Sequence, residues 1–130
     1  MKKLKAAVVG IGHLGKEHAR IYHELSDVEL VALCDTDRSK AERAEALGTK
    51  FTTDYHELFG SVDLISIATP TATHFQIARD VLNAGIHVLI EKPITNRLED
   101  ADELIDIARE KNLTLRVGHL ERYNAGFRRI

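Results

Sequence analysis

The amino-acid sequence predicts an α/β protein, with a doubly wound sheet of about six parallel strands and helices on both of its faces. Short apolar runs alternate along the chain with segments whose apolar residues recur at helical spacing. Strands that are separated by helices cannot pair as hairpins, so they must pair in parallel through right-handed crossovers. The first apolar run also ends in a glycine-rich turn that opens a helix, and 44% of the 130 residues are hydrophobic, as in globular domains.

Each strand is predicted from a short apolar run that ends at polar or turn-forming residues. The first run is apolar enough to be buried on both sides, which is typical of parallel strands. The fourth run is halted by Thr69-Pro70, and the fifth by Glu91-Lys92-Pro93. The six expected strands comprise residues 4–9, 28–33, 51–52, 64–68, 87–90 and 113–117.

Four helices and one short helical turn are predicted between these strands. Gly48 and Gly85 follow two of the helices, at the position where a left-handed backbone commonly ends a helix. Asp37 precedes the second helix and is expected to cap it. The expected helices and their apolar faces are 14–25 (Leu14, Ile21, Tyr22, Leu25), 39–47, 73–84 (Phe75, Ile77, Ala78, Val81, Leu82) and 98–111 (Ala101, Leu104, Ile105, Ala108), with the single turn at 55–59.

Charge and cysteine content narrow the classes of function. The formal net charge is −2 and both signs are spread along the chain, so no nucleic-acid or membrane-surface partner is expected. The apolar runs are too short to cross a bilayer, and the basic N-terminus leads into a short strand and a glycine turn rather than a signal peptide. Cys34 is the only cysteine, which predicts a buried, inert thiol and fits a reducing cytoplasm.

Residues 10–15 read Gly-Ile-Gly-His-Leu-Gly, which matches the G-x-G-x-x-G pattern of dinucleotide-binding loops. The pattern follows a predicted buried strand and opens a helix, as such a loop requires. Gly10 would allow the tight turn, Gly12 would let a pyrophosphate approach the backbone, and Gly15 would let the helix pack closely on the strand. His13 and Leu14 would stand at the helix N-terminus, which favours phosphate. The alternative is a plain strand-to-helix turn that needs glycines.

Asp35 stands at the end of the second strand, about twenty residues beyond the glycine loop. An acid at this point accepts hydrogen bonds from the adenosine ribose hydroxyls and repels a 2′-phosphate, which favours NAD over NADP. Arg38 is close enough to bind a 2′-phosphate or to stack on adenine, so NADP remains the less favoured cofactor. The alternative for Asp35 is a simple turn or helix cap.

Thr69, Pro70 and Thr71 follow the fourth strand, at the sheet edge where ligands lie in doubly wound folds. All three are candidate cofactor contacts. Thr73 could also contact the cofactor, but capping of the following helix is favoured. His74 is either a solvated histidine in the first helical turn or a residue of the site, and the sequence does not separate these alternatives.

Glu91-Lys92-Pro93 ends the fifth strand at the same edge. A lysine is usually a solvated surface charge, but Lys92 lies between a buried strand and a proline, where a nicotinamide would sit. Its amine could hydrogen-bond a substrate hydroxyl, and the positive ring of an oxidised cofactor would lower its pKa toward that of a working base. Pro93 would fix the backbone beyond the amine and could follow a cis bond.

Together these motifs resemble the glucose–fructose oxidoreductase / inositol dehydrogenase / MocA (Gfo/Idh/MocA) family. The glycine loop, Cys-Asp at 34–35, Ala-Thr-Pro-Thr-Ala-Thr-His at 68–74 and Ala-Gly-Ile-His-Val-Leu-Ile-Glu-Lys-Pro at 84–93 occur in the order and spacing of that family. The resemblance covers essentially the whole chain, and residues 69–93 are its most specific part. Residues 117–124 resemble the subgroup acting on nucleotide-linked sugars, such as UDP-N-acetylglucosamine 3-dehydrogenases, although Ala125 replaces the usual proline.

The resemblance implies that residues 1–118 form a Rossmann domain and that 119–130 begin the connection to a C-terminal substrate domain outside this sequence. The full-length enzyme would transfer a hydride between the nicotinamide and a secondary alcohol carbon of a sugar, sugar nucleotide or cyclitol. Lys92 would hold the reacting hydroxyl, and Glu91 would help to fix Lys92. Arg122 and Asn124 would face the substrate, or would belong to a solvated interdomain segment.

The missing domain would also supply an aspartate and a histidine one helical turn apart, and the contacts of a homo-oligomer. The 130-residue chain is therefore expected to bind nucleotide but to be inactive. The rival hypothesis is a stand-alone NAD(H)-binding regulatory module without catalysis, which would have no need for an amine beside the nicotinamide. No metal site is expected, because the seven histidines show no ligand spacing supported by cysteines or carboxylates.

Overall fold

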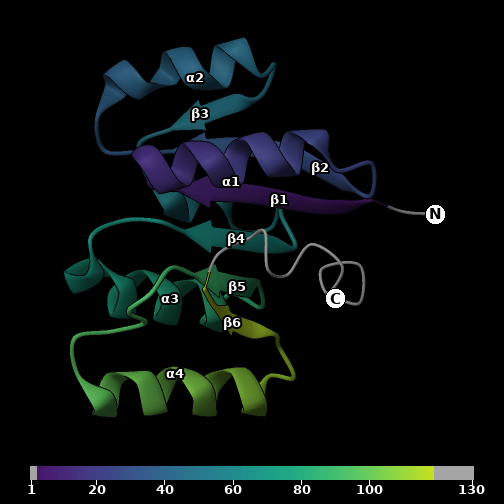
Figure 1. Cartoon of the computed structure of the whole chain (residues 1–130). Coiled ribbons are helices and arrows are strands. Elements are labelled where there is room, and N and C mark those ends of the chain that lie inside the picture. The colour runs from purple at the N-terminus through teal and green to yellow at the C-terminus, as the bar shows by residue number, and fades with distance from the viewer. Residues whose placement is uncertain (1–2, 119–130) are drawn as a thin grey trace.

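The computed structural model describes residues 3–118, which form a six-stranded, fully parallel sheet (Figure 1). The strand order is β3-β2-β1-β4-β5-β6, so the chain builds outward from β1 and then returns to the other side of β1. This reversal between β1 and β4 makes the sheet doubly wound. The strands are β1 (Leu4–Val9), β2 (Val28–Cys34), β3 (Lys50–Thr52), β4 (Leu64–Ile67), β5 (His87–Ile90) and β6 (Leu115–Val117).

Helices cover both faces of the sheet, as the alternation of apolar segments predicts. One face carries α1 and α2, and the other carries α3 and α4, which also pack against each other. Three short 3-10 turns complete the connections. The helices are α1 (His13–Glu24), α2 (Ala41–Ala46), α3 (His74–Asn83) and α4 (Leu98–Glu110), and the turns are η1 (Arg38–Lys40), η2 (Tyr55–Leu58) and η3 (Thr71–Thr73).

The sheet divides the hydrophobic core into two layers. Ala6 and Val8 of β1 pack with Tyr22 of α1 on one face. Ala7 and Val9 point to the opposite face and join the cluster beneath α3 and α4. The second half of β1, residues 6–9, is buried on both faces, so this strand leads its chain directly into the loop at its carboxyl end.

The predicted elements are confirmed, with differences at their boundaries. The helix expected at 39–47 is divided into η1 and α2. Leu14 and Ile105, which were assigned to apolar helix faces, are 37% and 43% exposed. Leu14 lies in the first turn of α1, at the open edge of the sheet. Ile105 follows the buried Leu104 and is therefore rotated by about 100° around the axis of α4.

Several local predictions are also confirmed. The Asp37 carboxylate caps η1 by accepting a hydrogen bond of 3.0 Å from the N–H of Ser39. Gly48 and Gly85 have φ angles of +68° and +82°. Cys34 is buried, and burial raises the pKa of its thiol to about 12, as expected of an inert group. Within residues 3–118, the structure contains no helix with the length and apolar character needed to cross a membrane.

Candidate cofactor-binding site

The polar segments singled out in the sequence lie at one edge of the sheet. Strands β2, β1, β4 and β5 are neighbours in that order, and each ends at this edge in one of these segments. A cleft of about 650 Å³ opens there, lined by the first three residues of the glycine loop (residues 10–15), the end of β2 and the segment after β4. Doubly wound sheets bind ligands at this point, where the strand order reverses.

The three glycines of the loop have different steric environments. Gly10 has a φ of +96°, and a Cβ atom there would lie 2.7 Å from the carbonyl carbon of Ala68. A Cβ on Gly15 would lie 1.7 Å from the carbonyl oxygen of Gly10, so α1 could not pack this closely on the loop. At Gly12, by contrast, φ is −83° and a Cβ would meet no atom within 4 Å. Folding therefore does not require a glycine at position 12.

The N-terminus of α1 opens beside Gly12. No side chain caps the helix at Gly12, and His13 and Leu14 are exposed in its first turn. Backbone N–H groups and the positive end of the helix dipole attract phosphate at such a position. The exposure of Leu14, unexpected for a core residue, agrees with its place in this loop.

Asp35 follows β2 directly and lines the cleft. Its Oδ2 accepts a hydrogen bond of 2.8 Å from the N–H of Ile11, and its Oδ1 accepts one of 2.9 Å from the N–H of Asp37. The carboxylate therefore ties the end of β2 to the glycine loop. Each carboxylate oxygen has a second lone pair, so Asp35 can also accept hydrogen bonds from the hydroxyl groups of a sugar.

Arg38 begins η1 and borders a second, more open hollow next to the glycine-loop cleft. Lys16 of α1, Lys40 and Arg43 line the same hollow, together with two glutamates of α2. This positive charge near Asp35 could receive a 2′-phosphate, as the sequence indicated for Arg38. Asp35 and Arg38 thus lie close together but suit different cofactors: a carboxylate suits NAD, and a guanidinium suits the 2′-phosphate of NADP.

The segment after β4 closes the other side of the cleft. Thr69 and Pro70 line it, and Thr71 begins η3. The prediction that Thr73 caps the following helix is wrong, because its side chain makes no capping hydrogen bond. Its hydroxyl donates instead to the carbonyl of Pro70 (2.7 Å) and lies 2.6 Å from Oγ1 of Thr69, so it fastens this loop internally.

His74 is 1% exposed, so the solvated alternative is wrong. Its Nε2 lies 2.8 Å from the carbonyl oxygen of Thr69, and its Nδ1 lies 3.0 Å from that of Pro93 and 3.1 Å from that of Ile94. The imidazole therefore connects the segment after β4 to the segment after β5. In this position it holds both loops in place and does not line the cleft.

Glu91 makes a contact that the sequence analysis missed. Its Oε1 lies 2.6 Å from Nε2 of His18, a fully buried residue of α1, and Glu91 itself is 8% exposed. The contact ties the segment that follows β5 to α1. Glu91 directly precedes Lys92, so the expectation that it helps to fix Lys92 would act through the backbone that the two residues share. The helical spacing of Gly15, His18 and Tyr22 could have shown that His18 needs a buried partner.

Lys92 is exposed just beyond the end of β5, directly after the buried Glu91. The peptide bond between Lys92 and Pro93 is cis. The amine therefore starts from a backbone that is held on one side by the His18–Glu91 contact and on the other by His74. Arg122 and Asn124, the predicted substrate contacts, lie outside the described residues. Within residues 3–118, no three or more His, Cys, Asp or Glu side chains are grouped to hold a metal ion.

A parallel sheet of this order, with an open glycine loop at its switch point and an acid after β2, defines a dinucleotide-binding Rossmann domain. Residues 4–119 match the family model GFO_IDH_MocA, described as "Oxidoreductase family, NAD-binding Rossmann fold". The chain belongs to this family, as the resemblance of its motifs predicted.

Similar proteins include several dehydrogenases. The UDP-N-acetylglucosamine 3-dehydrogenase of Acidithiobacillus ferrooxidans is 41% identical over 123 residues, which make up 94% of this chain and 39% of that protein. The structure of GenD2 from gentamicin A biosynthesis, in complex with NAD, has a TM-score of 0.87 at 35% identity, covering 91% of this chain and 35% of the other. Scyllo-inositol dehydrogenase from Lactobacillus casei, with bound NAD(H) and scyllo-inositol, has a TM-score of 0.85 at 27% identity, covering 94% and 38%.

Proposed function

We propose that this chain is the cofactor-binding half of a dehydrogenase that transfers a hydride between a nicotinamide cofactor and a secondary alcohol carbon of a sugar, sugar nucleotide or cyclitol. The observation that carries the proposal is the contrast within the glycine loop. Packing requires Gly10 and Gly15, whereas Gly12 borders empty space. A glycine that packing does not require leaves room for a ligand to approach the backbone.

The residues around the loop fit the parts of a dinucleotide in order. The pyrophosphate would lie over Gly12 and the first turn of α1, beside His13 and Leu14. Asp35 would accept hydrogen bonds from the adenosine ribose while keeping its contact with the N–H of Ile11. The cofactor would thus reinforce the existing link between the glycine loop and the end of β2.

Thr69, Pro70 and Thr71 would border the cofactor on the side of β4. His74 and Glu91 would act indirectly, by holding the segments that precede and carry Lys92. This division of roles follows from their burial and from the partners of their ring nitrogens and carboxylate.

The nicotinamide supplies the hydride chemistry, and the protein has to orient the substrate and manage its proton. The exposed Lys92 would hold the reacting hydroxyl and, in its neutral form, take the proton that leaves the oxygen. The names of the similar proteins support a sugar, sugar nucleotide or cyclitol as substrate, because they include a UDP-N-acetylglucosamine dehydrogenase and an inositol dehydrogenase. Arg122 and Asn124 are proposed as further substrate contacts.

This chain spans about 39% of the length of curated relatives such as the UDP-N-acetylglucosamine dehydrogenase. We therefore propose that turnover needs a further substrate domain and that the full-length protein forms a homo-oligomer. Titration calorimetry of the 130-residue chain should detect NAD(H), with weak affinity because part of the ligand's enclosure is missing. Absence of both NAD(H) and NADP(H) binding at millimolar ligand would refute the cofactor assignment. Robust dehydrogenase activity of this chain alone would refute the need for a second domain.

The proposed preference for NAD rests on Asp35 and can be tested separately. Asp35→Ser should weaken NAD⁺ binding about tenfold, because it removes charge-assisted hydrogen bonds, and should shift preference toward NADP⁺ by freeing Arg38 to pair with the 2′-phosphate. Asp37→Ser is the matched control, since it removes a neighbouring carboxylate that caps η1. Tighter binding of NADP⁺ than NAD⁺ by the unmodified chain would contradict the preference.

A further inference from the structure

Beyond Asp35 the cleft continues toward the end of β3 and the start of α3. Its lining there includes Thr53, Tyr55 and Ile77. In the proposed binding mode, the pyrophosphate lies at Gly12 and the adenosine ribose at Asp35, so the next group along the cofactor is adenine. An aromatic ring and a branched aliphatic side chain suit the faces of a flat base.

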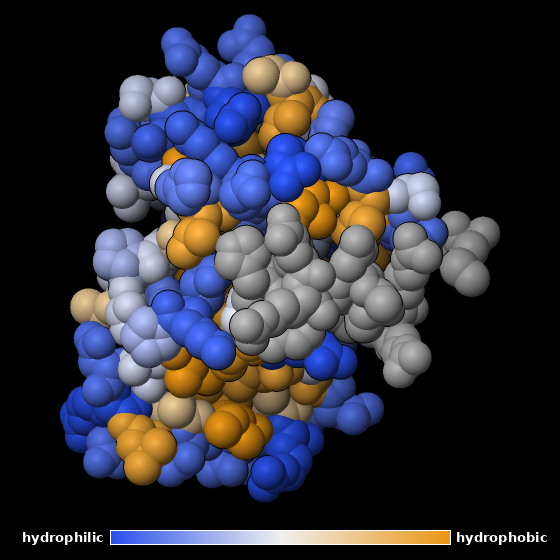
Figure 2. Space-filling model, in the orientation of Figure 1, coloured by the Kyte–Doolittle hydropathy of each residue, from blue (hydrophilic) through white to orange (hydrophobic). Residues whose placement is uncertain are grey.

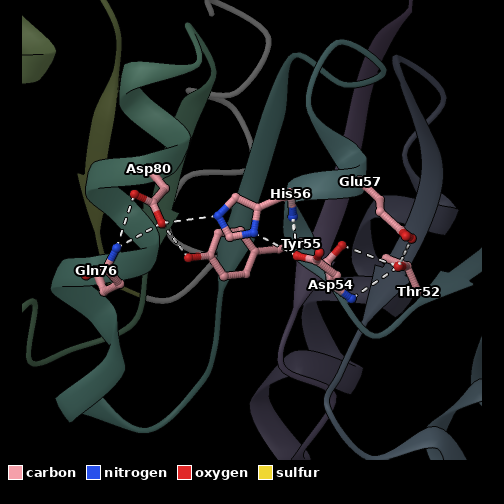
Figure 3. Close-up of polar contacts among 7 residues, drawn as sticks. All are labelled: Thr52, Asp54, Tyr55, His56, Glu57, Gln76 and Asp80. Atoms are coloured by element: carbon pink, nitrogen blue, oxygen red, sulfur yellow. Dashed lines mark hydrogen bonds and ion pairs between the residues drawn. The ribbon is translucent and has the colours of Figure 1, made fainter.

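The Tyr55 side chain is held in place from α3. Its hydroxyl donates a hydrogen bond of 2.6 Å to Oδ2 of Asp80 (Figure 3). Gln76, one turn earlier on α3, donates from Nε2 to both oxygens of the same carboxylate, at 3.2 and 3.0 Å. Gln76 thereby fixes the orientation of the Asp80 carboxylate that accepts the hydrogen bond from the Tyr55 hydroxyl. The bond joins η2 to α3 across 25 positions of sequence.

His56 supports the ring from another direction. Its imidazole stacks on the Tyr55 ring with 4.2 Å between the centroids and 24° between the planes. Its Nδ1 lies 2.7 Å from Oδ1 of Asp54, and its Nε2 lies 3.5 Å from Oδ2 of Asp80. The imidazole is thus placed between two carboxylates, and Figure 3 shows it beside the phenol that Asp80 holds. Stacking restricts the ring to a narrow range of orientations.

The turn that carries this pair is also fixed at its start. Oγ1 of Thr52, at the end of β3, accepts a hydrogen bond of 3.2 Å from the N–H of Asp54 and donates to the carboxylate of Glu57. Burial and the hydrogen bond to Asp80 raise the pKa of Tyr55, so the phenol stays protonated and remains a donor. The contacts of this network therefore all favour one position of the Tyr55 ring.

We propose that Tyr55 is a cofactor-binding residue whose ring forms the wall against which the adenine packs, and that Asp80 is the positioning residue that holds this ring. The proposal rests on the proposed function, because it takes the ligand to be an adenine dinucleotide. Its central observation is that Tyr55 lines the cleft while its hydroxyl is bonded to Asp80 of α3. A tyrosine whose only role was to link η2 to α3 would not need to border the cleft.

The first test compares NAD⁺ affinities of variants of the 130-residue chain by titration calorimetry. Tyr55→Leu should weaken binding about tenfold, because contact of a base with an aromatic ring is lost. Tyr55→Phe and Asp80→Ala each leave the ring but release it, so each should weaken binding less. The double variant Tyr55→Phe/Asp80→Ala should bind no more weakly than the weaker of the two single variants, because both changes break the same hydrogen bond between the Tyr55 hydroxyl and Asp80.

Two controls separate this role from general destabilisation. Tyr22→Phe removes another buried phenol contact, the one with Ser66 on the opposite face of the sheet, and should lower the thermal midpoint without changing NAD⁺ affinity. Asp106→Ala removes an exposed carboxylate from α4 and should change neither quantity. If Tyr22→Phe weakened NAD⁺ binding as much as Asp80→Ala does, Asp80 would have no specific positioning role.

The second test detects the contact between adenine and the Tyr55 ring directly. Nuclear Overhauser effects from the adenine H2 or H8 proton of bound NAD⁺ should reach the Tyr55 ring protons, whose signals are assigned by their loss in tyrosine-labelled Tyr55→Phe. Unchanged NAD⁺ affinity in Tyr55→Leu, or adenine contacts that exclude the Tyr55 ring, would overturn this inference and leave the proposed function intact. Failure of the unmodified chain to bind NAD⁺ would overturn both.

Discussion

Glu91 and Lys92 are neighbours in the sequence, yet they take opposite environments at the end of β5. Glu91 is 8% exposed and contacts His18 of α1, whereas Lys92 is exposed. Glu91 follows β5 directly and is held by α1, whereas Lys92 begins the bend that leads into the cis peptide bond to Pro93. One residue anchors the strand end, and the next is free to face a ligand.

Lys92 should accordingly contribute to chemistry more than to folding. In a full-length protein carrying this domain, Lys92→Ala should lower kcat by about 10²- to 10⁴-fold, because a hydroxyl-binding group and a base are lost. Cofactor affinity and the thermal midpoint should stay close to those of the parent. Lys92→Arg should not restore turnover, since the guanidinium remains protonated.

The matched control is Ile90→Ala, at the last residue of β5 and two positions before Lys92. Ile90 is fully buried, so its truncation should cost about 2–5 kcal/mol in the free energy of unfolding. Steady-state kinetics and thermal melts of both variants provide the measurement. Near-normal turnover of Lys92→Ala would remove Lys92 from the mechanism, and a collapsed midpoint would make it a structural residue.

Within single elements, the glycine loop allows a pair of substitutions with opposite outcomes. Gly15→Ala should unfold or strongly destabilise the chain, because the new Cβ would lie 1.7 Å from the carbonyl oxygen of Gly10. Gly12→Ala should keep the thermal midpoint, because its φ of −83° suits alanine and no atom lies within 4 Å of the new methyl group. That methyl group would nevertheless obstruct the pyrophosphate, so NAD⁺ affinity should fall. Unimpaired NAD⁺ binding by Gly12→Ala would show that no ligand approaches the backbone there.

The stability of the pairing between β5 and β6 should depend on pH through His87. The N–H of Thr114 donates to Nδ1 of His87 at 3.0 Å, which requires that this nitrogen be unprotonated. Burial lowers the pKa of His87 below its usual value of 6.5, although nearby Asp63 opposes the shift. The unfolded chain therefore binds this proton more readily, and the stabilisation is present above about pH 6.5 and is lost as pH falls through the folded-state pKa.

Thermal melts from about pH 8 to about pH 5 test this expectation. Replacement of His87 by Gln should flatten the loss of stability on the acid side. His56→Gln is the informative control, because the hydrogen bond with Asp54 raises the pKa of His56 and its contribution has the opposite sign. Its stabilisation is present below about pH 6.5 and is lost at higher pH, and it should be small because the side chain is 55% exposed. An identical pH profile in the unmodified chain and His87→Gln would contradict the role of His87.

For the molecule as a whole, α4 forms the outer surface on one side of the sheet. Leu98 and Ile105, two turns apart on this helix, are 77% and 43% exposed. Orange, hydrophobic side chains are visible over this lower part of the molecule in Figure 2. Exposed apolar side chains that line up on one helix face are typical of surfaces that associate.

We therefore expect weak, concentration-dependent self-association of the chain. The double substitution Leu98→Lys/Ile105→Lys should reduce it without lowering stability, since neither side chain belongs to the buried core. Sedimentation velocity over a range of concentrations measures the effect. A chain that is strictly monomeric at high concentration, or a double variant that associates as much as the parent, would contradict this prediction.

The sequence by itself determined the order of elements, the parallel pairing and the edge at which the motifs meet. These follow from local patterns: the continuous apolar run of β1, the helical spacing in α3, and glycines after α2 and α3. The separate roles of Gly10 and Gly15 could also be predicted, because a loop between a strand and a helix imposes them.

Only the tertiary structure decided which polar side chains hold the site and which face it. The His18–Glu91 contact joins residues 73 positions apart, and the Tyr55–Asp80 bond joins residues 25 positions apart. No local pattern contains such pairs, because they depend on how helices pack across the sheet. For the same reason, the pattern could not show that His74 is buried between two loops, since a first-turn histidine acquires its partners only when the neighbouring strands lie side by side.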